Sequence, residues 1–134
     1  MNESLALRIA VALAGCVPVF AGGAGAVFGH AMLGAPWDAA ADSHMRYLSG
    51  LLLGIGLGFW STIPAVEHHT ARFRLLTLIV VLGGLARLLG LGVVGWPGTA
   101  MAAALVMELV VTPVLCLWQA RVARLSASSG RGRE

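Results

Sequence analysis

Charged residues are scarce in this 134-residue chain: Asp, Glu, Lys and Arg together make up only 11% of it. Apolar residues make up 58%, and the mean hydropathy is +0.86. A water-soluble globular domain normally carries about 25% charged residues. The composition therefore excludes an ordinary soluble domain and predicts a protein whose solvent is a lipid bilayer.

Residues that commonly carry chemistry are also few. The two cysteines, Cys16 and Cys116, are expected at membrane depths that differ by about 10 Å or more, too far apart for a disulfide bond. The four histidines show no metal-ligand spacing, and no serine, histidine and acid share a plausible helix face. We therefore predict no metal site, no cofactor and no enzymatic activity.

Four long apolar stretches are present, and each is long enough to cross a hydrocarbon core, which takes about 20 residues. They cover residues 5–28, 45–66, 73–96 and 99–118. The segments between them leave no room for a second domain. Residues 1–125 are thus predicted to form one all-α domain, a four-transmembrane-helix bundle with up-down-up-down topology. Residues 126–134 are small, polar and basic, and are predicted to form a disordered tail.

The chain has no lysine, and its nine arginines are unevenly placed. With four spans, seven of them flank one side of the membrane: Arg8, Arg72, Arg74, Arg121, Arg124, Arg131 and Arg133. The positive-inside rule places that side, and with it both chain ends, in the cytoplasm. Because the basic residues follow the span ends in this way, they do not indicate nucleic-acid binding.

Two charged residues fall deep inside the predicted spans. Arg87 lies nine residues before Trp96 in the third span. Glu108 lies ten residues after Gly98 in the fourth. At 1.5 Å per residue both positions are about 13–15 Å from the outer turn, on adjacent antiparallel helices. Because an isolated charge at this depth costs about 2.5–3.5 kcal/mol, we predict that Arg87 and Glu108 form an ion pair.

Small residues near these charges predict close helix packing. The glycines expected to contact neighbouring helices are Gly50, Gly54, Gly58, Gly83, Gly84 and Gly90. Those of the second span continue a row that begins with Asp42 and Arg46 and has one member every four residues. Arg46 is therefore expected at the outer end of the same contact between helices. In the fourth span Pro113 leaves the carbonyl of Leu109 without its usual donor and is expected to bend the helix near Glu108.

Three runs of sequence are similar to a known family: HMRYLSGLLLGIGLGFW in the second span, GGLARLLGLG in the third and LVMELV in the fourth. They resemble the small four-helix bacterial integral membrane proteins of domain of unknown function family 4345, and the resemblance covers nearly the whole chain. Its motif residues here are Arg46, Tyr47, Gly50, Gly54, Gly56, Gly84, Arg87, Gly90 and Glu108. The resemblance implies an integral membrane protein with the polar trio Arg46, Arg87 and Glu108, and we expect it in the bacterial inner membrane. It implies no reaction.

Three interpretations of the polar residues remain open. In the first they only fix the register of a structural or accessory membrane subunit. In the second they bind an acidic lipid or an amphipathic anion, because two arginines against one glutamate leave a positive charge if Asp42 faces water. The candidate ligand-binding residues are Arg46, Tyr47, Arg87 and Glu108. In the third, Glu108 titrates during proton-coupled transport.

The glycine row of the second span leaves the assembly state open as well. Such rows mediate contacts between chains as readily as contacts within one chain. A second copy of the chain or another membrane protein is therefore an expected partner at this face, in addition to the lipid bilayer.

Overall fold

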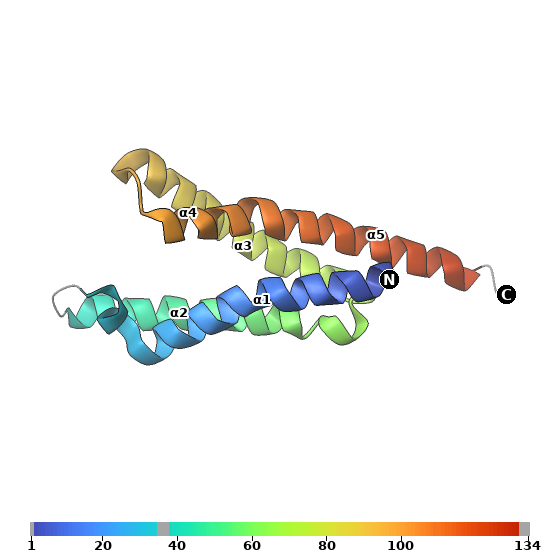
Figure 1. The fold of residues 1–134 in the computed structure, drawn as a ribbon, viewed down its shortest axis with the longest axis horizontal. Helices are drawn as coiled ribbons and strands as arrows, with labels where there is room; N and C mark the ends of the chain where they lie inside the picture. The colour runs from blue at the N-terminus through green and yellow to red at the C-terminus, as the bar shows by residue number, and fades with distance from the viewer. Residues whose placement is uncertain (1, 35–37, 132–134) are drawn as a thin grey trace. The chain divides into compact units, whose positions relative to one another are not determined.

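The computed structural model describes residues 2–34 and 38–131. All regular structure in these ranges is helical, as Figure 1 shows, so the predicted all-α fold is confirmed. The elements are α1 (Glu3–Phe28), η1 (Gly29–Leu33), α2 (Ala39–Trp60), η2 (Ile63–Ala65), α3 (Thr70–Val94), α4 (Thr99–Val106), η3 (Met107–Val111) and α5 (Thr112–Arg131). Among them η1 and η2 are 3₁₀ turns and η3 is a π-helical turn.

Four helical stretches are long and apolar enough to cross a membrane, which confirms the predicted number of spans. They are Glu3–Met32, Ala39–Ala65, Thr70–Val94 and Thr99–Ser129. The second begins six residues before its predicted start because Asp38 caps it: its carboxylate accepts a hydrogen bond from the backbone N–H of Ala40 at 3.0 Å. The third ends two residues early, at Val94, before Gly95.

The C-terminal segment differs from its prediction. Residues 126–131 are helical and continue α5, where the sequence predicts a disordered tail. The hydroxyls of Ser128 and Ser129 donate to the carbonyl of Leu125 at 2.8 and 3.1 Å. A helix already formed extends without a new nucleation cost, so even this polar segment adds turns to it. Residues 132–134 of the predicted tail lie outside the described ranges.

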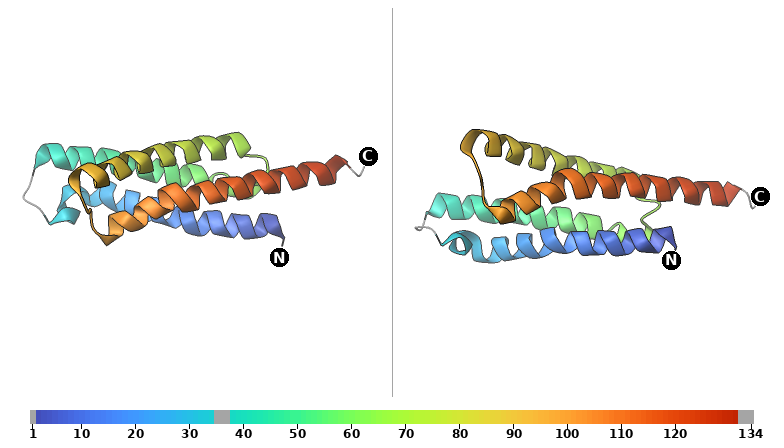
Figure 2. Two further views of the ribbon diagram at one scale, coloured as in Figure 1. Left: turned by 90° about the horizontal axis from the view of Figure 1, so that it is seen from above. Right: turned by 45° about the horizontal axis from the view of Figure 1, so that its top comes forward.

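The chain divides into two compact units. The N-terminal unit is Arg8–Pro64, with most of α1 and all of α2. The C-terminal unit is Ala65–Glu134 together with Met1–Leu7, the first turns of α1. Each unit contains one antiparallel pair of long helices, joined in the N-terminal unit by the connection after α1 and in the C-terminal unit by the turn after α3 (Figures 1 and 2).

In the N-terminal unit α1 and α2 approach closely at small residues. A Cβ atom added to Gly22 would lie 2.5 Å from the backbone nitrogen of Leu53, and one added to Gly56 would lie 2.7 Å from a methyl group of Val19. Near the other end of α2, the indole nitrogen of Trp60 donates to the carbonyl of Ala12 at 3.1 Å. At Gly22 the two backbones therefore meet without a side chain between them.

The predicted glycine row does not make this contact. No described atom lies within 4 Å of a Cβ added to Gly50 or Gly54. A step of four residues turns 400° around a helix, so the row drifts by about 40° at each step and leaves the α1 face soon after Asp42 and Arg46. The packing role of Gly58 stays a prediction; its carbonyl accepts the hydroxyl of Ser61 at 2.6 Å.

In the C-terminal unit α3 packs against the continuous run of α4, η3 and α5, which Figure 2 shows as one long helix. A Cβ atom on Gly84 would lie 2.9 Å from the Cβ of Glu108, so this glycine lies against the partner helix. A Cβ atom on Gly83 or Gly90 meets no described atom within 4 Å. Only one of the three faces the partner helix.

Matched alanine substitutions distinguish the two sets of glycines. We expect Gly22→Ala to destabilise the protein by about 1–3 kcal/mol, since its methyl group meets backbone that cannot turn away. Gly50→Ala should be neutral or stabilise by up to about 1 kcal/mol through helix propensity. Thermal unfolding in detergent micelles measures both. Equal losses in the two variants would contradict this assignment of the α1–α2 contact.

Candidate functional site

The ion pair predicted from depth alone is present in the C-terminal unit. The Nε of Arg87, on α3, donates to Oε2 of Glu108 at 3.0 Å, and its Nη2 donates to Oε1 at 3.1 Å. The planar guanidinium thus meets both carboxylate oxygens, the bidentate arrangement in which such pairs are strongest. One positive and one negative charge cancel inside the helix pair.

The surroundings of the pair are sparse in polar groups. The third guanidinium nitrogen, Nη1 of Arg87, contacts the sulfur of Met101 at 3.0 Å, a weak acceptor in the first turn of α4. The side chain of Glu108 is 18% exposed and that of Arg87 is 36% exposed. The carboxylate is therefore held inside the seam, while the arginine reaches it from the edge.

Glu108 lies in an irregular turn of the helix that the sequence predicts only as a bend. In η3 the backbone N–H of Thr112 bonds to the carbonyl of Met107, five residues earlier. The hydroxyl of Thr112 donates to the same carbonyl at 2.8 Å. Pro113 explains the irregularity, because it has no N–H and its ring clashes with the carbonyl four residues before it. Single π turns of this kind are frequent at functional sites.

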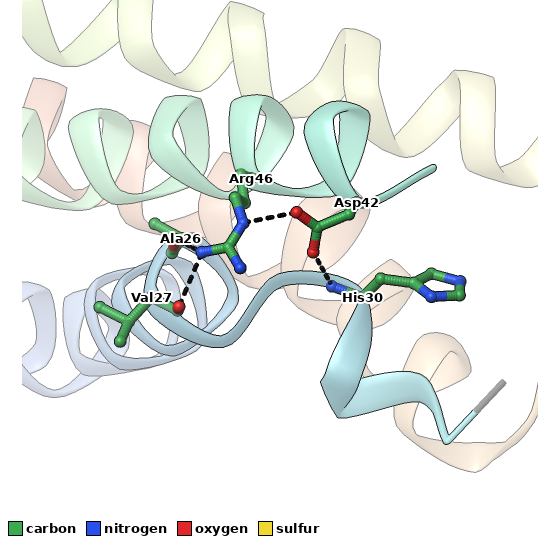
Figure 3. Close-up of polar contacts among 5 residues, drawn as sticks. All are labelled: Ala26, Val27, His30, Asp42 and Arg46. Atoms are coloured by element: carbon green, nitrogen blue, oxygen red, sulfur yellow. Dashed lines mark hydrogen bonds and ion pairs between the residues drawn. The ribbon is translucent and has the colours of Figure 1, made fainter. Parts of the chain in front are cut away.

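A second polar cluster joins the two helices of the N-terminal unit, as Figure 3 shows. The Nε of Arg46 donates to Oδ2 of Asp42 at 2.7 Å, one turn earlier on α2. The other carboxylate oxygen of Asp42 accepts the backbone N–H of His30 at 2.8 Å. This carboxylate therefore bridges α2 to His30, two residues past the end of α1.

Arg46 connects the same two helices through backbone carbonyl groups of α1. Its Nη1 donates to the carbonyls of Ala26 and Val27 at 3.0 and 2.7 Å (Figure 3). These carbonyls belong to the last turn of α1, where no later N–H of the helix is available to them. A positive charge at a helix C-terminus is also favoured by the helix dipole. Arg46 is thus the C-terminal cap of α1, supplied by another helix.

Gly29 makes the approach possible. Its φ angle is +57°, a conformation that suits glycine, and a Cβ atom there would lie 2.8 Å from Nε of Arg46 and still closer to Asp42. Gly29, His30 and the two carbonyls are members of the cluster that sequence reasoning missed. The sequence offered one signal for this cluster: Gly29 directly follows an apolar helix, and helices commonly end at a glycine in the αL conformation.

The predicted site residues therefore fall into two clusters, one in each unit. Arg87 and Glu108 are brought together in the C-terminal unit, and Arg46 is paired with Asp42 in the N-terminal unit. The side chain of Tyr47 is 65% exposed on α2. Asp42 does not point to water, so the excess positive charge expected from two arginines and one glutamate is cancelled. A single centre made of all the predicted site residues remains a prediction.

Other chemistry has little support in the part of the chain that the structure describes. No group of three His, Cys, Asp or Glu side chains there could hold a metal ion. Cys16 and Cys116 are both free thiols. The thiol of Cys16 donates to the carbonyl of Ala12 at 3.3 Å, an ordinary contact along its own helix.

The fold and the two clusters define a class: an all-α protein with four helices of membrane-spanning length, in which neighbouring helices are joined by charged side chains. The family model described as "Domain of unknown function (DUF4345)" matches residues 6–119. The chain belongs to this family. No curated protein and no solved structure matches it.

Two glycines with the same backbone conformation test the cluster around Arg46. Gly29 and Gly34 have φ angles of +57° and +61°, so replacement by alanine costs each of them about 1–2 kcal/mol in backbone strain. Only at Gly29 would the new methyl group also displace Asp42 and Arg46, since a Cβ on Gly34 meets no described atom within 4 Å. We expect a clearly larger loss of unfolding free energy for Gly29→Ala, measured in detergent. Equal losses would mean that backbone strain alone matters here.

Proposed function

We propose that this protein is a multi-pass structural or accessory subunit of the bacterial inner membrane, with both chain ends in the cytoplasm. The four helices of spanning length and the distribution of arginine support this topology. In the C-terminal unit Arg72 and Arg74 begin α3, and Arg121 and Arg124 lie near the end of α5. The turn at the other end of that hairpin, GWPG, carries no charge.

The observation that carries the proposal is the bidentate bond between Arg87 and Glu108. Both carboxylate oxygens are occupied by one guanidinium, and neither charge is left for a substrate. The same balance holds between Arg46 and Asp42. In an apolar medium a pair that joins two helices, as Arg87 and Glu108 do, specifies which helix faces meet and at what level, because a slipped register leaves each charge alone. The geometry supports a fixed scaffold.

Charge reversal tests this role. We expect Arg87→Glu and Glu108→Arg each to destabilise the protein by an amount between the about 0–1 kcal/mol of an exposed pair and the about 3–5 kcal/mol of a fully buried one. The double variant restores opposite charges and should recover much of the loss. Thermal unfolding in micelles and the yield of membrane-inserted protein provide the measurements.

The pair between Arg121 and Glu3 is the matched control. It has an N–O distance of 3.2 Å, but its side chains are 64% and 47% exposed. Reversal of either charge there should change stability by less than about 1 kcal/mol. If the Arg87 and Glu108 variants behave like this control, or if the double variant is worse than both singles, the register role is refuted.

A second candidate function, binding of an acidic lipid, is favoured by one feature of Arg46. Its side chain is 42% exposed, and no described residue accepts a hydrogen bond from its Nη2. Two N–H groups on a permanently charged guanidinium suit a phosphate oxygen. Tyr47 is next to it in sequence and exposed, so its ring is available to a lipid headgroup region.

Native mass spectrometry with phosphatidylglycerol and phosphatidylcholine tests lipid binding. Arg46→Lys keeps the charge but removes the planar fork, and we expect it to lower retention of phosphatidylglycerol about tenfold, equivalent to about 1.4 kcal/mol. Arg124→Lys is the control, since its Nε bonds only to the carbonyl of Ala120 in its own helix. Equal retention by wild type, Arg46→Lys and Arg124→Lys would exclude this lipid site.

A further inference from the structure

Gln119 is a fully buried polar residue in the C-terminal unit, with 0% of its surface exposed. Its Nε2 donates to the carbonyl of Val66 at 2.8 Å and to Oγ1 of Thr70 at 2.9 Å. A backbone carbonyl accepts only, so the amide nitrogen must face Val66 and the orientation of the side-chain amide is fixed. The residue ties α5 to the beginning of α3.

The other half of the same amide has no such partner. Oε1 of Gln119 is buried, and no described residue donates a hydrogen bond to it. Leaving a buried acceptor unsatisfied is strongly unfavourable, and proteins usually satisfy such groups with a bound water that has two to four polar partners. Oε1 has lone pairs only, so the ligand must be a hydrogen-bond donor. This excludes a simple anion.

Thr77, farther along the contact between α3 and α5, also carries a buried polar atom without a described partner. It is 9% exposed, and its hydroxyl is buried with no described partner. Seven residues turn a helix through 700°, so Thr70, Thr77 and Gly84 lie within about 40° of one another on α3. Thr70 contacts Gln119 and Gly84 faces Glu108, so this face of α3 is the one that meets η3 and α5.

We propose that water binds inside the C-terminal unit at Oε1 of Gln119 and, about 10 Å farther along α3, at the hydroxyl of Thr77. The seam between α3 and α5 is then hydrated from the end where α3 begins, in the direction of the Arg87–Glu108 pair. This goes beyond the scaffold role, which requires only the ion pair. Both polar atoms are buried, so each site suits a small neutral molecule such as water, which donates to Oε1 of Gln119 and either donates to or accepts from the Thr77 hydroxyl.

Gln119 is the only glutamine in the chain, so its amide can be observed alone. Protein labelled with glutamine carrying ¹³Cδ and ¹⁵Nε, and with leucine carrying ¹³C-methyl groups, is placed in lipid bilayers for water-edited solid-state NMR. We expect magnetisation from water to reach Cδ of Gln119 several-fold faster than it reaches the leucine methyl carbons. Build-up as slow as that of the methyl groups overturns the Gln119 site. A chemical shift typical of a bonded carbonyl without water transfer also overturns it, because the donor would then belong to the protein.

Thr77→Val tests the second site by removing the hydroxyl while keeping the side-chain shape. If water bonds to this hydroxyl, the melting temperature in detergent falls, as it should for the control Thr112→Val, which removes a hydroxyl bonded to Met107. If the hydroxyl is unpaired and dry, its removal leaves the melting temperature unchanged or raises it. Either of those results overturns hydration at Thr77.

Discussion

The charge of Arg87 imposes the strongest single constraint on the C-terminal unit. A guanidinium cannot lose its proton, so the helix that carries it must present a counter-charge at the same level or leave the apolar phase. Glu108 provides that charge through two parallel hydrogen bonds. Close approach of the helices is possible because Gly84 places no side chain against Glu108. The ion pair, the close approach at Gly84 and the register of α3 against η3 therefore depend on one another. None of the three forms without the other two.

Backbone groups impose the second constraint, because an N–H or C=O group removed from water without a partner is costly. At the end of α1 the orphan carbonyls of Ala26 and Val27 accept from Arg46, whose own charge is balanced by Asp42. At Pro113 the missing N–H disturbs the bonding of the preceding turn, and the π turn with the hydroxyl of Thr112 is the accommodation. In both places a side-chain donor bonds to backbone carbonyl groups where regular helical hydrogen bonding is interrupted. Polar residues in this chain therefore serve helix ends and helix irregularities as much as they serve each other.

The features that could be predicted from the sequence are those that depend on simple helix geometry. Counting 1.5 Å per residue from a tight turn was sufficient to pair Arg87 with Glu108, since two antiparallel helices share one depth scale. The glycine row was harder, because a spacing of four drifts around the helix and Gly50 and Gly54 left the face that carries Asp42. The partners of Arg46 were not predictable from side-chain types, because two of them are backbone carbonyls whose availability depends on where α1 ends. The helical state of residues 126–131 depends on extension from α5 and not on local composition.

The balance of charge restricts what this protein can bind. A ligand anion at Arg87 would have to displace a carboxylate that already occupies the guanidinium in the optimal geometry, and the displaced Glu108 would then be a lone charge within the seam. Arg46 differs, because its Nη2 extends beyond its partners and its side chain is more exposed. Neutral polar groups differ again: Gln119 and Thr77 carry no charge to compensate, only unfilled hydrogen-bonding capacity. Charged ligands are therefore expected at the edge of the N-terminal unit, whereas the interior of the C-terminal unit suits small neutral donors such as water.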